Sequence, residues 1–134
     1  MERRWGMSSA MWNEPKLARV AQKMLKVLGV RAAALDIILL DHKSIAKLKA
    51  RFIKKKTEPN VLSFPEPVYF PHPETKKRYL GEIYLNRDIL KRSPERAQAL
   101  LLHGVLHLLG YDHIKKVDMV EMEVLEAKIL KKFK

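Results

Sequence analysis

The 134-residue chain contains no cysteine. This absence excludes a disulfide framework, cysteine-ligated zinc and a cysteine nucleophile, so a bound metal must use His or carboxylate ligands. No stretch approaches the roughly 18 apolar residues that span a bilayer. The segment from Met1 to Trp12 also lacks the apolar core of a signal peptide. We therefore expect a soluble, cytoplasmic protein without a membrane partner.

Acidic residues are scarce relative to basic ones: 15 Asp and Glu stand against 27 Lys and Arg, which leaves a formal charge of +12. Such an excess favours a polyanionic partner, because basic side chains bind phosphates by releasing condensed counterions. Nucleic acid is the leading partner class. Lysine-rich surfaces also serve solubility and are common in heat-adapted proteins, so charge alone leaves that alternative open. The basic residues cluster at 54–56, 76–78 and 131–134.

The length and the 47% hydrophobic content fit a single domain, 1–134, with its own core. Apolar residues at three- and four-residue spacing predict helices at 14–28, 43–52 and 114–132. Short apolar runs predict a buried strand at 34–40 and further strands at 60–64 and 80–86. A proline-rich loop covers 65–77. Ser93 as N-cap, with Pro94 after it, predicts another helix that ends at Gly110, and its apolar character places it centrally.

Three of the five histidines, His103, His107 and His113, fall within eleven residues. Side chains four residues apart on a helix lie on the same face, so His103 and His107 can present two imidazoles to one point. Gly110 can adopt the left-handed conformation that ends a helix, which lets His113 reach the same point. Three imidazoles with an open fourth position suit catalytic Zn²⁺. The alternative is that each histidine only packs or forms hydrogen bonds.

Gly104 restricts the chemistry that such a metal would serve. In HExxH metallopeptidases a Glu follows the first His and acts as general base, and this sequence has Gly104 at that position. Peptidase activity is therefore disfavoured. Bound Zn²⁺ lowers the pKa of its water to about 7 and polarises phosphoryl oxygens, so the site of a basic protein suits hydrolysis of a nucleic-acid phosphodiester.

The segment HGVLHLLGYDH, residues 103–113, resembles the signature of the YbeY family of bacterial endoribonucleases and ribosomal RNA maturation factors. The resemblance covers most of the chain from about residue 34 onward. Further segments similar to those of the family follow in the same order: NVLSFP at 60–65, GEI at 81–83 and EMEVLE at 121–126.

The resemblance implies a fold as well as a site. The expected fold is α+β, with a small mixed β-sheet packed by helices and a central helix that carries a metalloprotease-like HxxxHxxxxxH site. The family also implies one Zn²⁺ ion and a role in maturing ribosomal RNA ends. Its implied zinc ligands are His103, His107 and His113.

One position departs from the family pattern. Family members usually have an arginine eight residues before the valine of the NVLSF segment, where it is thought to meet substrate phosphate, and this sequence has Ile53 there. Isoleucine offers neither a charge nor a donor. A loop two residues longer would bring Arg51 to that place, so Arg51 is our first substitute, against an ordinary solvated arginine. Lys54 could hold phosphate as a point charge or be solvated surface.

Glu82 is the nearest candidate for a general base, because it is a carboxylate inside an otherwise apolar strand. The alternative is that Glu82 lies on an exposed face of that strand. His42 and His72 are far from the histidine cluster in sequence, and we expect both to be surface residues.

We therefore predict a zinc-dependent, single-strand-specific endoribonuclease that matures small-subunit ribosomal RNA ends and serves ribosome quality control. Its expected partners are RNA, above all ribosomal RNA, and the small ribosomal subunit; the sequence predicts no oligomeric state. A non-cleaving, RNA-binding ribosome assembly factor with a structural zinc is the alternative, and Ile53 is its best support. A metallopeptidase-like hydrolase acting on other substrates is a third hypothesis, which Gly104 disfavours.

Overall fold

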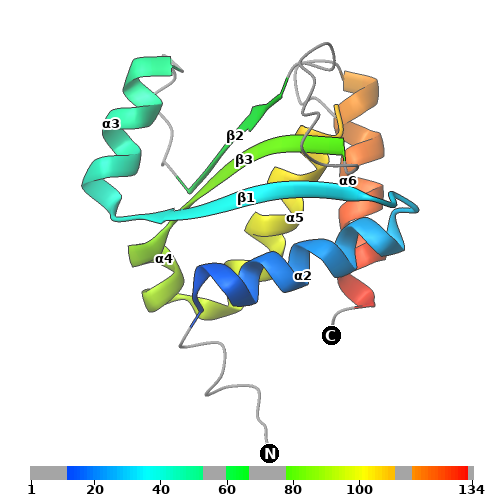
Figure 1. Cartoon of the computed structure of the whole chain (residues 1–134), viewed down its shortest axis with the longest axis horizontal. Coiled ribbons are helices and arrows are strands. Elements are labelled where there is room, and N and C mark those ends of the chain that lie inside the picture. Colours follow the sequence, from blue (N-terminus) through cyan, green and yellow to red (C-terminus); the bar gives the residue numbers. More distant parts are fainter. Residues whose placement is uncertain (1–11, 53–59, 67–77, 111–115, 133–134) are drawn as a thin grey trace, which may run out of the picture.

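The computed structural model describes residues 12–52, 60–66, 78–110 and 116–132, with side chains over the same ranges except 116–122. Helices and strands are mixed as far as β3, and only helices follow within the described chain (Figure 1). This order confirms the α+β class. No described helix is both long and apolar enough to cross a membrane. The elements are α2 (Glu14–Val27), β1 (Ala33–Leu40), α3 (His42–Phe52), β2 (Val61–Pro65), β3 (Arg78–Asn86), α4 (Arg87–Arg92), the 3₁₀ turn η1 (Pro94–Arg96), α5 (Ala97–Leu108) and α6 (Lys116–Lys131).

The three described strands form one sheet in the order β1-β3-β2. β1 pairs with β3 in parallel, and β2 pairs with β3 in antiparallel orientation, so the small mixed sheet is confirmed. The prediction that 34–40 is a buried strand is wrong in part. β1 lies at an edge of the described sheet, where Ala33 and Ile37 are its buried residues and Asp36 is exposed. One neighbouring strand and one covered face do not bury a whole strand.

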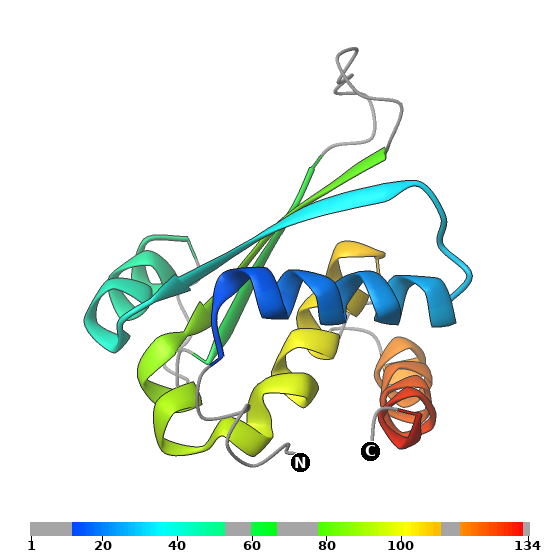
Figure 2. The same cartoon turned by 60° about the horizontal axis from the view of Figure 1, so that its bottom comes forward.

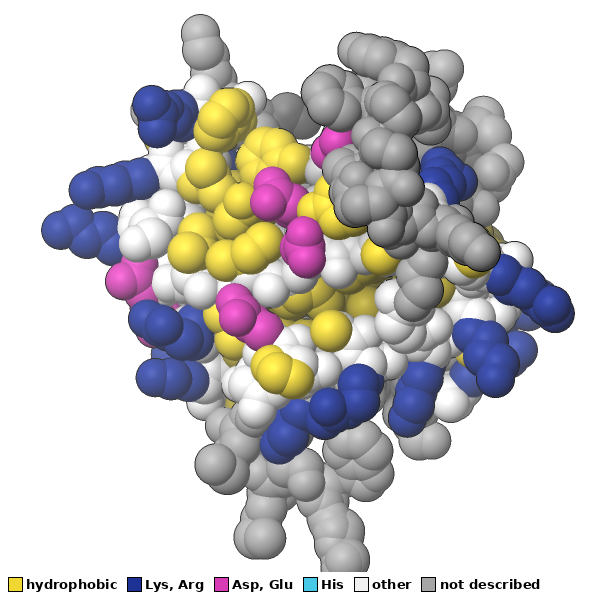
Figure 3. Space-filling view, in the orientation of Figure 1, with side chains coloured by type: hydrophobic (Ala, Val, Ile, Leu, Met, Phe, Trp, Pro, Cys, Tyr) yellow, Lys and Arg dark blue, Asp and Glu magenta, His cyan; other side chains and the backbone are white. Residues whose placement is uncertain are grey.

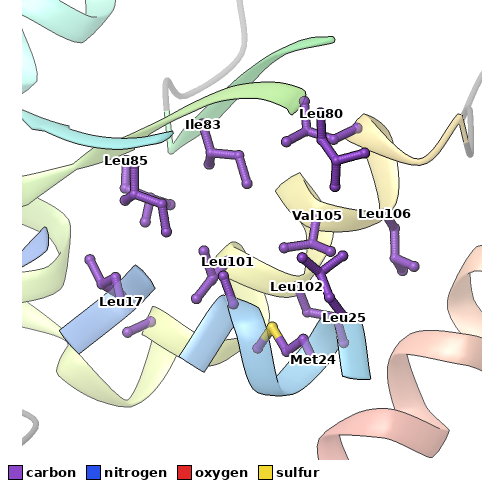
Figure 4. Close-up of a cluster of buried hydrophobic side chains, with 14 of the residues drawn as sticks. Leu17, Met24, Leu25, Leu80, Ile83, Leu85, Leu101, Leu102, Val105 and Leu106 are labelled. Atoms are coloured by element: carbon purple, nitrogen blue, oxygen red, sulfur yellow. The ribbon is translucent and has the colours of Figure 1, made fainter. Parts of the chain in front are cut away.

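The core lies between the sheet and a helical layer, in which α2 and α5 cover one face and α6 packs against α5 (Figure 2). α5 is the central helix, as predicted, because most of its side chains are buried. Apolar side chains from α2, β3 and α5 meet in one cluster (Figure 4). Its largest fully buried members are Leu17, Met24, Leu25, Ile83, Leu85, Leu101, Leu102, Val105 and Leu106.

The other face of the sheet, which we call the outer sheet face, points away from α5. Acidic side chains lie among hydrophobic ones near its centre, and Lys and Arg side chains lie around the rim (Figure 3). Phe64 of β2 makes edge-to-face contacts with Phe52 and Tyr84, at centroid distances of 5.4 and 5.6 Å. The outer sheet face is therefore apolar and partly acidic, on a chain whose net charge is +12.

Helix α4 is an element that our sequence analysis missed. Asn86, which is fully buried, caps the helix by accepting a hydrogen bond from the Ile89 amide over 3.1 Å. The side-chain amide nitrogen of Asn86 lies 3.0 Å from Nδ1 of His42. His42 itself is exposed, as expected. The sequence signal was an Asn cap followed by Asp88 in the first turn, but the helix is only six residues long.

The predicted capping role of Ser93 is wrong. Ser93 makes no side-chain capping bond, and Pro94 opens the 3₁₀ turn η1 rather than an α-helix. The α-helix begins three residues later, at Ala97, after Arg96 in a helical conformation. Since a 3₁₀ turn commonly precedes an α-helix, the Ser-Pro signal marked the entry to the helix but not its first turn.

Candidate metal centre

The histidine pair, His103 and His107, lies on one face of α5. The two Nε2 atoms are 3.2 Å apart, and the ring centroids are 4.7 Å apart at an interplanar angle of 65°. Both residues are half-buried, whereas Leu102 and Val105 on the other sides of the helix are fully buried. The helix therefore presents two imidazoles to one point, as their four-residue spacing predicts.

This separation suits two ligands of one metal ion. Imidazole nitrogens bind Zn²⁺ at about 2.0–2.1 Å, so two nitrogens on a tetrahedral ion lie about 3.3 Å apart. The observed Nε2 separation of 3.2 Å is close to that value. The donors are also chemically right, because neutral imidazole is a preferred ligand of Zn²⁺. The histidine pair thus fits a zinc ion without rearrangement of α5.

Helix α6 brings a carboxylate to the histidine pair. Glu126 Oε2 lies 3.6 Å from Nδ1 of His103, the ring nitrogen that does not face His107. The two side chains are 30% and 21% exposed, so water screens the contact only in part. A carboxylate beside the second nitrogen of a metal-ligating histidine orients the ring and raises its basicity. Our sequence analysis missed Glu126, because this contact depends on how α6 packs on α5 rather than on a local pattern.

Gly104 packs closely against the sheet. A Cβ atom at this position would be 2.9 Å from Cγ2 of Ile83 and 3.2 Å from Oγ of Ser63. The Ser63 hydroxyl also donates to the Gly104 carbonyl over 3.3 Å. Position 104 therefore faces the sheet, where the glutamate of an HExxH motif has no space. This packing gives a physical reason for the absence of the peptidase motif.

The end of α5 follows the prediction. Gly110 has a φ of +102°, in the region that favours glycine, and its amide donates to the His107 carbonyl over 3.0 Å. The chain therefore turns directly after the histidine pair. His113, the third predicted ligand, lies outside the described residues. Within the described residues, no three His, Asp or Glu side chains form a group that could hold a metal ion, so the three-ligand site stays a prediction.

A pocket of about 450 Å³ opens beside His103. This pocket, which we call the basic pocket, is surrounded by residues of α3, the start of β2, the end of η1, the first two turns of α5, and the C-terminal half of α6. Lys49 and Arg96 contribute two cationic side chains to the lining, next to His103 and Glu126. Arg96 is the residue directly before α5, and it lines the same pocket as His103. The histidine pair thus borders, through His103, a cavity lined by two cationic side chains.

The structure describes one of the two predicted phosphate contacts, Arg51. Arg51 is exposed in the last turn of α3 and does not line the pocket. Lys54 lies outside the described residues, as does Ile53. Lys49 is instead the lysine of α3 that lines the pocket, and it is only 8% exposed. A signal existed, because Lys49 follows the buried Ile45 by four residues and so shares its face of the helix.

The structure does not bring Glu82 to the histidine pair. The Tyr84 hydroxyl donates to Glu82 Oε1 over 3.2 Å, so both side chains lie on the outer sheet face. Ile83 between them faces Gly104 on α5. Glu82 is half-buried on the face of β3 that points away from α5, which is close to the alternative that we gave, and its general-base role stays a prediction. Burial of the phenol and then the charge of Glu82 raise the pKa of Tyr84.

Fold and site together define an α+β protein whose central helix carries a histidine pair that fits a metal ion, beside a basic pocket. A family model described as Endoribonuclease YbeY matches residues 7–134. The chain therefore belongs to the YbeY family.

Individual relatives agree with this assignment. The endoribonuclease YbeY of Vesicomyosocius okutanii is 36% identical over 128 residues, which cover 90% of this chain and 86% of the relative. The Mycolicibacterium smegmatis protein of the same name is 33% identical, in a match that covers 90% of this chain and 76% of the relative. That of Thermobifida fusca is 32% identical over 130 residues, or 88% and 84%. The similarity thus spans nearly the whole chain and includes the segment with the histidine pair.

Proposed function

We propose that this chain is a metal-dependent endoribonuclease that hydrolyses phosphodiester bonds of single-stranded RNA, with one Zn²⁺ held by His103, His107 and His113. The observation that carries the proposal is the 3.2 Å separation of the two Nε2 atoms on the side of α5 that borders the basic pocket. The names of the relatives supply the reaction class. The charge of +12 supplies affinity for a polyanionic substrate.

In this proposal, His103 and His107 bind the metal through neutral imidazole nitrogens, and basic residues bind the phosphates of the RNA. Bound Zn²⁺ would supply a Lewis acid for a phosphoryl oxygen and lower the pKa of a coordinated water. His103 must direct a neutral Nε2 toward the metal, so its proton belongs on Nδ1, the nitrogen beside Glu126. Arg51, exposed at the end of α3, and Lys54 just beyond it would contact phosphates of the bound strand.

The proposed substrate is ribosomal RNA, and the proposed role is to mature small-subunit RNA ends and to serve ribosome quality control in the cytoplasm. This part of the proposal rests on the family to which the chain belongs. The basic composition is consistent with a partner as rich in phosphate as the ribosome.

The second candidate function is a ribosome assembly factor that keeps zinc for structure and binds RNA without cutting it. The observation that favours it is Ile53, which stands where the family usually has a phosphate-binding arginine. This candidate predicts strong, salt-sensitive RNA binding without turnover.

A cleavage time course on single-stranded ribosomal RNA separates the two candidates. Zinc-loaded protein is compared with a His107→Ala variant that is purified identically and checked for folding by circular dichroism. His107 is half-buried rather than in the core, so the variant is expected to fold. We expect cleavage by the parent protein alone. Equal cleavage by both would indicate a contaminating ribonuclease, and salt-sensitive binding without cleavage would support the assembly factor.

A further inference from the structure

The basic pocket carries three polar side chains whose role the proposed function leaves open. They come from three separate parts of the chain: Lys49 from α3, Asn60 directly before β2, and Arg96 at the end of η1, directly before α5. The histidine pair borders the same pocket through His103. A ligand in the pocket would therefore contact these groups and lie next to a metal held by the histidines.

Lys49 and Arg96 give the pocket its positive charge. Lys49 is 8% exposed, so little of the residue is in contact with bulk water. Arg96 is exposed and lines the pocket from the residue directly before α5. Glu126 is the acidic residue among the described lining residues, and it contacts His103. The rest of the pocket thus suits an anion.

Asn60 adds a buried hydrogen-bond acceptor. Among the described atoms, its Oδ1 is buried and has no hydrogen-bond partner. The residue is held in place, since its carbonyl accepts from the Asn86 amide over 3.0 Å. Buried polar atoms in proteins are nearly always paired, so an unpaired one in a pocket lining points to a donor on the ligand. Phosphate diesters have no donor, whereas a ribose hydroxyl is one.

We infer that the basic pocket binds the ribonucleotide next to the cleaved phosphodiester. Lys49 and Arg96 contact its phosphate oxygens, and Asn60 Oδ1 accepts a hydrogen bond from its 2′-hydroxyl. A ribonucleotide supplies both the anion and the donor that the lining requires, and a deoxyribonucleotide lacks the 2′ donor. This inference rests on the proposed function, and it assigns the phosphate contact that Ile53 cannot make to residues outside the family position.

The charge part is tested with Lys49→Met, which keeps the apolar stem, and Arg96→Gln. The matched controls are Lys47→Met on α3 and Arg92→Gln on α4, both at exposed positions. We expect KM for a short single-stranded RNA to rise about tenfold in each pocket variant while kcat changes little, as for the loss of one charge-assisted contact. The slope of log K against log salt should fall by about 0.7 per lost phosphate contact.

The ribose part is tested by equilibrium binding of metal-free protein to RNA and DNA oligonucleotides of the same sequence. The parent protein should prefer the RNA, and Asn60→Ala should reduce that preference several-fold. Lys49→Arg, which keeps the charge, should retain most RNA affinity if the fold is intact.

The outcomes separate this inference from the proposed function. Unchanged KM and unchanged salt slopes in both pocket variants of an active enzyme would overturn the pocket assignment and leave the nuclease. An equal RNA preference in Asn60→Ala and the parent would overturn the ribose contact. If the parent binds RNA without cutting it, and the pocket variants but not the controls lose affinity, the pocket assignment stands and the nuclease does not.

Discussion

At the scale of single residues, the two nitrogens of His103 face different neighbours. Nε2 faces His107 at 3.2 Å, and Nδ1 faces Glu126 at 3.6 Å. A metal ligand and an orienting carboxylate therefore do not compete for the same atom. The arrangement assigns each imidazole nitrogen one task, which is how protein metal sites fix the tautomer of their ligands.

Replacing Glu126 should weaken metal binding without removing a ligand. Loss of an orienting carboxylate typically lowers metal affinity 10- to 100-fold, and we expect Glu126→Gln to fall in that range. Competition with a chelator of known zinc affinity measures the change. Glu123→Gln, an exposed position on the same helix, is the matched control. Equal zinc affinity in Glu126→Gln and the parent would contradict the orienting role.

Adding a methyl group at Gly104 should destabilise the protein. Gly to Ala inside a helix normally stabilises by about 1 kcal/mol, but here the new Cβ meets Ile83 at 2.9 Å. Because Ile83 is fully buried in the core, it has little room to move. Overpacking costs about 1–3 kcal/mol, so we expect a net loss near 1 kcal/mol in the free energy of unfolding measured with urea. A gain in stability would contradict this prediction, because it would show that Ile83 can move to accommodate the methyl group.

For single residues, the sequence predicted positions correctly where the regular spacing of side chains along one helix determines them. The four-residue spacing of His103 and His107 predicted their shared face because helix geometry is local. Glu126 and Lys49 reach the site through the packing of α6 and α3. The spacing from Ile45 places Lys49 on the buried face of α3, but no spacing shows which cavity that face lines. Glu82 is the opposite case: its place in an apolar strand made it a candidate, and the alternation of the strand turns its side chain to the outer sheet face.

At the scale of elements, the buried Asn86 caps α4, the helix that directly follows β3. Asn86→Ala should cost about 2 kcal/mol in unfolding free energy, because it removes the cap of α4 and a buried hydrogen-bonding amide. The exposed cap of α2, where Asn13 accepts from the Lys16 amide over 2.9 Å, is the matched comparison. We expect Asn13→Ala to cost less, about 0.5–1 kcal/mol. Equal losses in chemical denaturation would contradict a special role for the buried cap.

Asp41 should make the stability of α3 depend on pH. Hydrogen bonds from the side chain and then the backbone of Ser44 hold the pKa of Asp41 below its ordinary value of 3.8. A lowered folded-state pKa stabilises the fold fully above that ordinary value, and the contribution is lost as the pH falls through the lower folded value. The stability difference between the parent and Asp41→Asn should therefore be constant near neutral pH and shrink in strong acid. A difference that does not change with pH would contradict this coupling.

Most elements lie within two or three residues of their predicted bounds, because amphipathic periods and turn residues are local signals. Two of the failures have local causes and the third does not. α4 is too short to show a period, and Ser93 lies before a 3₁₀ turn whose geometry does not use a side-chain cap. β1 was judged by its apolar content, but burial depends on its place at the sheet edge, which the sequence does not state.

At the scale of the whole molecule, the fold separates two surfaces. The outer sheet face is apolar and partly acidic (Figure 3). The basic pocket and the histidine pair lie on the helical side of the sheet, where α3, α5 and α6 approach one another. This meeting of α3 with the later helices α5 and α6 is a tertiary feature, so local sequence patterns do not show which basic side chains line the pocket.

The central claim is that a metal ion at the histidine pair performs RNA cleavage. The most direct test measures the rate of single-stranded RNA cleavage while zinc is titrated into metal-free protein, with the amount of bound zinc followed in parallel. We predict that the rate rises in proportion to bound zinc, levels off at one ion per chain, and stays at background for a folded His103→Ala variant at every zinc concentration. Cleavage that does not depend on zinc, or that survives equally in the His103→Ala variant, would contradict the claim.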